Sequence, residues 1–180
     1  MTGLPMRQAI LIFALVVPAA VLQGQILRAR VWLPGFTTQV ALDTVTVPEE
    51  LDAPYGKVYT AVIAAFDELK IPLDTRDSAR GVVGNLTLTK RVSLAGSPLS
   101  RWLNCGAGIT GPNADNWRIY IAVVALLDRV SMSNKTQTRV AMLAGAQDMQ
   151  GNSKDPVVCA SSGALETTML ELVRKRINAP

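Results

Sequence analysis

The residues with the strongest chemical signature are GAGITG, at positions 106–111. Their glycines match the spacing G-x-G-x-x-G of a dinucleotide-binding loop, and an acidic residue, Asp128, follows seventeen positions after the last glycine. In such a loop the glycines connect a strand to a helix of about a dozen residues, and the N-terminus of that helix binds the pyrophosphate. The pattern therefore raises the question of a nucleotide cofactor.

The residues after this loop argue against such a cofactor. Only the five residues 112–116 separate Gly111 from the apolar segment that begins at Trp117, so a crossover helix has no room there. Pro112 and the polar residues that follow it are typical of a loop. We therefore expect no nucleotide cofactor, and we interpret the glycines as turn residues with positive φ in a long loop over residues 95–116.

The two cysteines of the chain offer a different role for the loop. Cys105 lies directly before the first glycine, and Cys159 is the only other cysteine. Two cysteines in an exported chain most simply form one disulfide. A reactive thiol is the alternative, but a thiol nucleophile needs a base, and the chain contains no histidine. We therefore predict a disulfide between Cys105 and Cys159 that anchors the glycine-rich loop.

Other catalytic or metal chemistry has little support in the sequence. The absence of histidine removes the commonest general base and the commonest transition-metal ligand. Asp74 and Asp77 are typical of a turn, and Asp67 and Glu68 lie on the polar side of a predicted helix. The net charge is +4, but the basic residues are scattered, which disfavours nucleic acid as a partner. We expect no catalytic residue, no cofactor and no metal.

An apolar run, AILIFALVVPAAVL, occupies residues 9–22 and follows Arg7. Its fourteen residues are typical of the centre of a signal peptide, because a membrane-spanning helix needs about 20 apolar residues. We predict a signal peptide or a membrane anchor over residues 1–24, and a periplasmic or secreted domain that is either free or tethered to the membrane. Arg28 and Arg30 keep an inverted, cytoplasmic orientation open, since positive charges after an apolar run oppose its translocation.

The elements that follow begin with a predicted linker over residues 25–37, which lacks a clear hydrophobic period. The predicted domain covers residues 38–180. Val45 and Val47 alternate with threonines, which predicts a first strand. Apolar residues at helical spacing then predict an amphipathic helix over residues 54–70. The apolar stripe of this helix consists of Val58, Ala61, Val62, Ala65, Phe66 and Leu69.

Two later segments have the alternation of strands. GVVGNLTLTKRV, residues 81–92, places Val82, Leu86 and Leu88 on one predicted face. WRIYIAVVALLD, residues 117–128, is apolar on both faces, so we predict a central strand or a strand whose second face is covered. The first face holds Ile119, Ile121 and Val123, and the second, which we predict as an interaction face, holds Tyr120, Val124 and Leu126.

The C-terminal part predicts one more strand, over TQTRVAMLAGA at residues 136–146, and a second helix that starts after Gly163. The inner stripe of this helix contains Leu165, Met169, Leu172 and Val173. The order β-α-β-β-β-β-α predicts an α+β domain, in which an antiparallel sheet of four to five strands carries two amphipathic helices on one face.

The segment KVYTAVIAAFDELKIPLDTRDSARGVVGN, residues 57–85, combines an amphipathic helix with Leu-Lys-Ile-Pro-Leu-Asp and an Asp-x-x-x-Gly-x-Val-x-Gly entry into a strand. It resembles the small helix-grip domains of bacterial envelope proteins, such as the lipoprotein accessory subunit of the outer-membrane β-barrel assembly machine. The resemblance implies a non-enzymatic, periplasmic protein-interaction module with an envelope protein as its partner. The chain departs from that lipoprotein because no acylated cysteine follows the apolar run and because the pair Cys105 and Cys159 is added.

Three classes of function remain after these considerations. We expect a non-enzymatic interaction or scaffold domain of the cell envelope. A carrier for a small apolar ligand is the alternative, and its ligand would lie between the second helix and the sheet. An enzyme is the third class.

Overall fold

The computed structural model describes residues 28–150 and 155–179. The predicted signal peptide or anchor at residues 1–24 lies outside the described residues. The helices are α1 (Tyr55–Glu68), α2 (Asn113–Asn116) and α3 (Ala164–Ile177), and the 3-10 turns are η1 (Leu42–Thr44) and η2 (Leu99–Arg101). The strands are β1 (Arg30–Val31), β2 (Val40–Ala41), β3 (Glu49–Leu51), β4 (Thr75–Asp77), β5 (Val82–Lys90), β6 (Ser93–Leu94), β7 (Ser97–Pro98), β8 (Leu103–Asn104), β9 (Ala107–Gly108), β10 (Gly111–Pro112), β11 (Arg118–Arg129), β12 (Thr136–Gln147) and β13 (Val157–Ser161).

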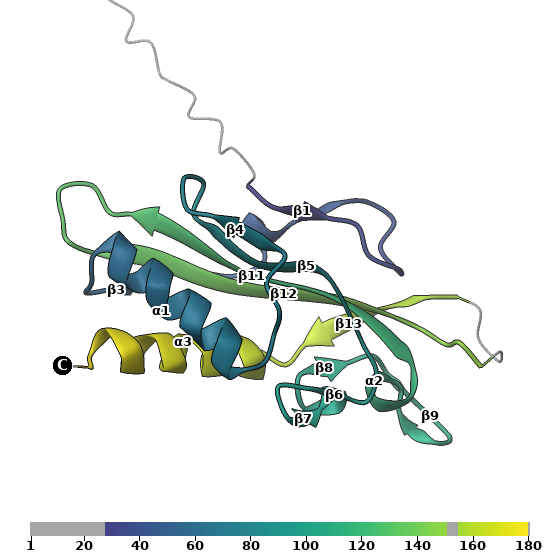
Figure 1. Cartoon of the computed structure of the whole chain (residues 1–180). Helices are drawn as coiled ribbons and strands as arrows, with labels where there is room; N and C mark the ends of the chain where they lie inside the picture. Colours follow the sequence, from purple (N-terminus) through teal and green to yellow (C-terminus); the bar gives the residue numbers. More distant parts are fainter. Residues whose placement is uncertain (1–27, 151–154, 180) are drawn as a thin grey trace, which may run out of the picture.

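A seven-stranded antiparallel sheet forms the centre of the fold, which confirms the α+β class (Figure 1). The strand order is β4-β5-β11-β12-β13-β8, and β3 pairs with the other end of β12. The twelve-residue strands β11 and β12 pair along their whole length, from Arg118 opposite Gln147 to Arg129 opposite Thr136. The sheet exceeds the predicted four to five strands because β3, β4 and β8 have only two or three residues, too few for a recognisable alternation.

Helices α1 and α3 lie side by side on one face of the sheet, the front face (Figure 1). The predicted apolar stripe of α1 is buried from Val58 to Phe66, and both helices form at the predicted positions. Leu165, Met169 and Val173 of α3 are buried in the same core cluster as the front side of β11. Burial of these two helical stripes against the sheet supplies the main core of the domain.

The opposite, back face of the sheet is covered by the chain's own residues 28–44, which we call the back-face segment (Figure 1). Its side chains Ala29, Val31, Leu33 and Leu42 are buried, and they form a second core cluster with residues of β5, β11 and β12. The prediction of a linker up to residue 37 is therefore wrong for the described residues 28–37, and so is the predicted domain start at residue 38.

The back-face segment also occupies the predicted interaction face. Val124 and Leu126 are fully buried beneath it, and Tyr120 is partly buried at the margin of the same cluster. The second apolar face of β11 thus exists as predicted, but the chain itself covers it. A partner protein therefore cannot contact Val124 and Leu126 while the back-face segment stays in place, whereas Tyr120 keeps part of its surface exposed.

Backbone contact is closest where the back-face segment crosses β12. Gly145 lies directly beneath Pro34, and a Cβ atom at position 145 would lie 1.9 Å from the Pro34 carbonyl oxygen. Gly35 packs against the backbone of β13 with φ of 90°, a conformation that favours glycine. Glycine at both positions therefore allows the segment to lie flat on the sheet.

The first predicted strand differs from the structure. Val45 and Val47 are exposed, Val47 to 87%, and they lie in the connection between η1 and β3. The strand forms instead at Glu49–Leu51, where it pairs with Thr136–Thr138 of β12. The alternation of valine and threonine was misleading, because a strand also needs a neighbouring strand to pair with. These residues connect one face of the sheet to its edge, and no strand of the described chain lies beside them there.

A bulge in β5 alters the predicted faces of that strand. Asn85 of β5 pairs with Val123 of β11, and Leu88 of β5 pairs with Ile121. Between these two pairs β5 advances by three residues and β11 by only two, so β5 contains one extra residue. The extra residue moves the following side chains to the other face. Val82 accordingly packs in the back cluster and Leu88 in the front cluster, and the prediction that they share a face is wrong.

The glycine loop is part of an insertion between β5 and β11. Strands β9 and β10 pair as a hairpin, with Gly108 opposite Gly111, and the four-residue helix α2 follows directly. Gly106 and Gly111 have positive φ, as the turn interpretation predicts, but Gly108 does not, because it is an extended residue of β9. The chain then enters β11, which is antiparallel to both of its neighbours, so the loop lacks the parallel strand and crossover helix of a dinucleotide-binding unit.

Candidate functional site

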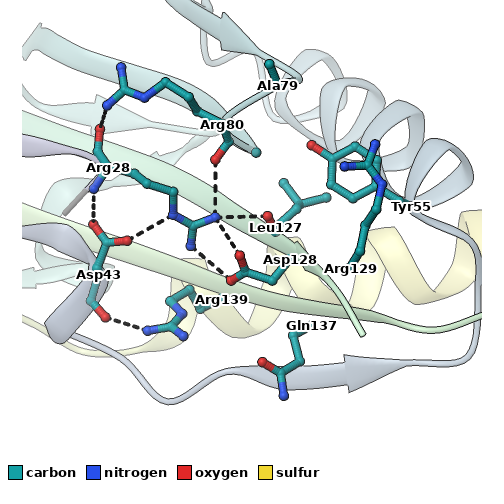
Figure 2. Close-up of a pocket in the computed structure, with 11 residues that line it drawn as sticks. Arg28, Asp43, Tyr55, Ala79, Arg80, Leu127, Asp128, Arg129, Gln137 and Arg139 are labelled. Carbon is teal, nitrogen blue, oxygen red and sulfur yellow. Dashed lines mark hydrogen bonds and ion pairs between the residues drawn. The ribbon is translucent and has the colours of Figure 1, made fainter. Parts of the chain in front are cut away.

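A cavity of about 590 Å³ opens where the ends of β11 and β12 meet the back-face segment and the start of α1 (Figure 2). We call it the arginine cavity, because four arginines reach it from four different elements or turns. The residues that line it are Arg28, Asp43, Tyr55, Ala79, Arg80, Gly81, Leu127, Asp128, Arg129, Gln137 and Arg139.

Arg28 forms ion pairs with both acidic residues of the cavity. Its Nε atom lies 3.1 Å from Asp43 Oδ1, and its Nη1 and Nη2 atoms donate to the two carboxylate oxygens of Asp128, each at 3.0 Å. Nη1 also donates to the carbonyl oxygens of Leu127 and Arg80, so the guanidinium is held on several sides (Figure 2). The side chains of Arg28 and Asp43 are each only 14% exposed. This network joins the start of the back-face segment to the end of β11.

The surroundings of Asp43 change its acidity. Burial raises the pKa of the Asp43 carboxyl, but hydrogen bonds from the Arg28 side chain and from the backbone N–H groups of Ala29 and Arg28 outweigh it, so the pKa lies below its ordinary value of 3.8. Asp43 is therefore ionised at neutral pH, and its ion pair with Arg28 contributes to the stability of the fold.

This lowered pKa predicts a loss of stability in acid. Because the Asp43 pKa is lower in the folded state, its contribution is present above the unfolded-state value and disappears as the pH falls through the folded-state value. We expect the difference in unfolding free energy between wild type and Asp43→Asn to shrink as the pH falls from about 6 to about 3 in denaturant melts. The exposed Asp67→Asn is the matched control. A wild-type to Asp43→Asn difference that is independent of pH would contradict the assignment.

Arg129 and Tyr55 form one wall of the cavity. The Arg129 guanidinium carbon lies 3.9 Å from the centroid of the Tyr55 ring, which is the geometry of a cation–π contact. The Tyr55 hydroxyl donates to the Ser78 carbonyl at 2.6 Å, and burial raises its pKa, so it stays protonated at neutral pH. The stacking holds the Arg129 side chain against the ring. The N–H groups at the edge of its guanidinium plane can still donate hydrogen bonds to another acceptor.

Arg139 lies on β12, two positions from Gln137, so both side chains belong to the same face of that strand. Its Nη1 atom donates to the Asp43 carbonyl oxygen. Its Nε atom is buried and has no hydrogen-bond partner among the residues that the structure describes. A buried donor of a charged group without an acceptor is costly, and such an atom is a reason to look for an external acceptor.

The charge balance of the cavity is positive. Four arginines and two aspartates line it, which gives a formal charge of +2. Both aspartates are bound by Arg28, and in the described part of the chain neither Arg129 nor Arg139 forms an ion pair with a carboxylate. The cavity is therefore suited to bind an anionic group.

A second cavity, of about 570 Å³, adjoins the first. We call it the loop cavity, because most of its lining belongs to the loop between β11 and β12. The two cavities share Tyr55 and Arg129, so they meet at the stacked pair. The only other charged residue of the loop cavity is Lys135, whose Nζ atom lies 2.6 Å from Glu50 Oε1 and 3.1 Å from Asp52 Oδ1.

No known protein family matches this chain. No curated protein matches it either. In the described residues, no helix is both long and apolar enough to cross a membrane, and no cluster of histidine, cysteine or acidic residues could hold a metal ion.

The residues predicted from sequence lie away from the arginine cavity. Cys105 and Cys159 form the predicted disulfide, which connects the insertion to β13 at the other end of the sheet. Tyr120, Val124 and Leu126 lie under the back-face segment, as described above. The cavity itself was not predicted from the sequence. Gln137 and Arg139 offered a signal, because they lie on the same face of β12 as Ala141 and Leu143 of the back cluster, where an apolar face would have continued with apolar side chains.

Proposed function

We propose that this chain is a non-enzymatic protein-interaction domain of the cell envelope, and that it binds its partner at the arginine cavity. The observation that carries the proposal is an open cavity with fixed positive charge whose lining lacks a nucleophile paired with a base. Serine, threonine, cysteine, lysine and histidine are all absent from the described residues that line it. Such a lining is suited to binding and poorly suited to covalent chemistry.

The acidic residues of the cavity also support a binding role. A general base works best with a pKa near the operating pH, whereas the pKa of Asp43 lies below its ordinary value. Asp128 accepts two hydrogen bonds from Arg28, so both of its oxygens are engaged. The carboxylates therefore position Arg28 and the back-face segment, and we assign them no catalytic step.

Two observations support a place outside the cytoplasm. The disulfide between Cys105 and Cys159 is compatible with the periplasm or the extracellular space, where disulfides persist. The apolar run at residues 9–22 is typical of an export signal or an anchor. Together they favour an exported domain, which is either free or held at the membrane by its N-terminal residues.

The packing beneath α3 gives less support to a carrier of apolar ligands. Leu165, Met169 and Val173 fill the interface between α3 and the sheet, and each is at most 1% exposed. Both cavities described above open at the ends of β11 and β12 instead, and charged or polar groups line most of the first. A carrier would need apolar space where this chain has a packed core.

Site-specific crosslinking in the native host tests the proposal. A photo-crosslinking amino acid at Gln137, inside the cavity, is expected to capture one defined envelope protein in the periplasmic or membrane fraction. Thr89, an exposed residue of β5 outside the cavity lining, is the matched control position. The same products from both positions would exclude the cavity as the binding site. Recovery of the chain in the cytoplasm with two free thiols would exclude the envelope.

A further inference from the structure

The outer side of the back-face segment carries an exposed aromatic side chain. Val31 and Leu33 face the sheet, so Arg30 and Trp32, which alternate with them, face away from it. Trp32 is 67% exposed, and its Nε1 atom donates to the Phe36 carbonyl oxygen at 2.8 Å. Because this N–H group is already bonded within the segment, a partner that buried the indole ring would leave no donor unpaired.

More apolar surface and a second cation lie on the same side of the sheet. Val158 of β13 is 49% exposed, and its backbone packs against Gly35 of the back-face segment. The Val158 side chain points to the back, because its two neighbours in β13 pack in the front cluster. Arg118 also faces the back, since it lies two positions before Tyr120 on β11.

We call this surface the tryptophan patch, and its residues are Arg30, Trp32, Arg118 and Val158. Among the described residues, neither of its two arginines forms an ion pair with a carboxylate. Asp43, the only acidic residue of the back-face segment, is bound by Arg28. The patch therefore combines positive charge with exposed apolar surface. None of its residues lines either cavity, so it is separate from the candidate site.

The position of the patch in the chain limits what can cover it. The apolar run of the sequence ends at Leu22, and only residues 23–27 separate it from Arg28. Even a fully extended chain spans only about 20 Å over this distance. A run that is held in a membrane therefore keeps the back-face segment, the first described part of the domain, close to the membrane surface.

We propose that the tryptophan patch binds the surface of an anionic phospholipid bilayer. Indole rings are favoured at the level of the lipid head groups, because one side of the ring meets apolar chains and the other meets water. The two arginines attract the anionic head groups. Helices α1 and α3 lie on the opposite face of the sheet and would point away from the membrane (Figure 1). This inference goes beyond the proposed function, because it adds a second binding surface.

A bilayer fits the patch better than a second copy of the chain does. Stable interfaces between proteins have an apolar core from which charged residues are depleted. The patch offers only one indole ring and one valine, together with two arginines that would meet the same arginines of an identical copy. Anionic lipid head groups supply the opposite charge instead, and the lipid chains below them accept the ring.

Fluorescence quenching tests this inference on the protein as it is purified from its host. The protein is combined with vesicles of two parts phosphatidylcholine to one part phosphatidylglycerol, and the phosphatidylcholine carries bromine on its acyl chains. We expect the vesicles to quench the Trp32 fluorescence, because the ring would lie within reach of the bromine atoms. Trp32→Phe should abolish this quenching. Trp117→Phe is the matched control and should retain it, because Trp117 packs against the front cluster, and Trp102 is buried in both variants.

A charge variant measures the contribution of the head groups. Arg30→Gln should weaken docking about fivefold when the quenching is titrated with phosphatidylglycerol, because one cation near the surface is removed. Lys57→Gln is the matched control, since it removes the same charge from an exposed position of α1 on the front side. It should change docking by less than about twofold, because charges far from the membrane are screened by salt. Circular dichroism checks that each variant is folded.

Several results would overturn the inference. These are an absence of quenching, equal quenching in Trp32→Phe, equal docking to phosphatidylcholine alone, or an equal loss in Lys57→Gln. A change of Trp32 fluorescence with protein concentration in the absence of lipid would assign the patch to a second copy of the chain instead. The crosslink at Gln137 reports on the arginine cavity, so a failure there would refute the proposed function and leave the membrane contact standing.

Discussion

Replacement of both Cys105 and Cys159 by alanine is expected to lower the free energy of unfolding by about 4 kcal/mol. The disulfide joins positions that are 54 residues apart, and a crosslink over a long segment removes much conformational entropy from the unfolded chain. It also fixes the insertion between β5 and β11 to the core, because Cys105 lies next to β8 and Cys159 lies in β13. For a domain of this size, the loss corresponds to a melting temperature lower by about 10 °C.

Thermal and denaturant melts measure this effect, and the reductant supplies the control. Dithiothreitol should lower the melting temperature of the wild type to about that of the double variant, and it should leave the double variant unchanged. Limited proteolysis should cleave the reduced protein first within residues 91–117, where the anchor has been lost. A loss of stability below about 1 kcal/mol would show that the insertion is held by its packing alone.

Gly145→Val is expected to release the back-face segment from the sheet. A Cβ atom at this position would lie 1.9 Å from the Pro34 carbonyl oxygen, and that oxygen belongs to the backbone, so it cannot rotate away as a flexible side chain would. Release would expose Val124 and Leu126 as well as the segment's own buried side chains. We expect a loss of about 3 kcal/mol in unfolding free energy, because apolar burial on the back face is lost or strained.

Hydrogen exchange distinguishes this mechanism from a general loss of stability. The backbone amides of residues 28–44 should exchange faster in Gly145→Val, while those of α1 keep their protection. Gly56→Val is the matched control, because a Cβ atom at Gly56 meets nothing within 4 Å. It should change the unfolding free energy by less than about 1 kcal/mol. Unchanged protection of residues 28–44 in Gly145→Val would mean that the segment tolerates the added side chain.

Several parts of the fold could be predicted because their signals are local. The stripe from Val58 to Phe66 identifies α1, since its spacing matches the turn of a helix whatever the helix packs against. The two apolar faces of residues 117–128 identify a strand that is covered on both sides. The lack of a crossover helix after the glycine loop could be predicted by counting the residues between Gly111 and Trp117, and only the four-residue helix α2 lies there. The disulfide followed from the presence of two cysteines.

Other features depended on contacts between distant segments. Residues 28–37 resembled a linker, because Ala29, Val31 and Leu33 are too few to indicate a buried segment until the sheet provides a surface for them. The bulge in β5 became visible only through the pairing of Asn85 and Leu88 with β11. Local alternation cannot show such a shift, since it is the partner strand that defines the register.

The candidate site is the clearest case of what only the tertiary structure decided. Arg28 contacts Asp43 across 15 positions of sequence and Asp128 across 100 positions. Arg139 meets Asp43 across 96 positions. Each of these residues taken alone is an ordinary surface charge, and no spacing connects them. The sequence determined the helices, the central strand and the disulfide, which are encoded by local periodicity and composition. The cavity arose because packing of residues 28–44 on the sheet brought separate charges together, and long-range packing leaves no periodic trace in the chain.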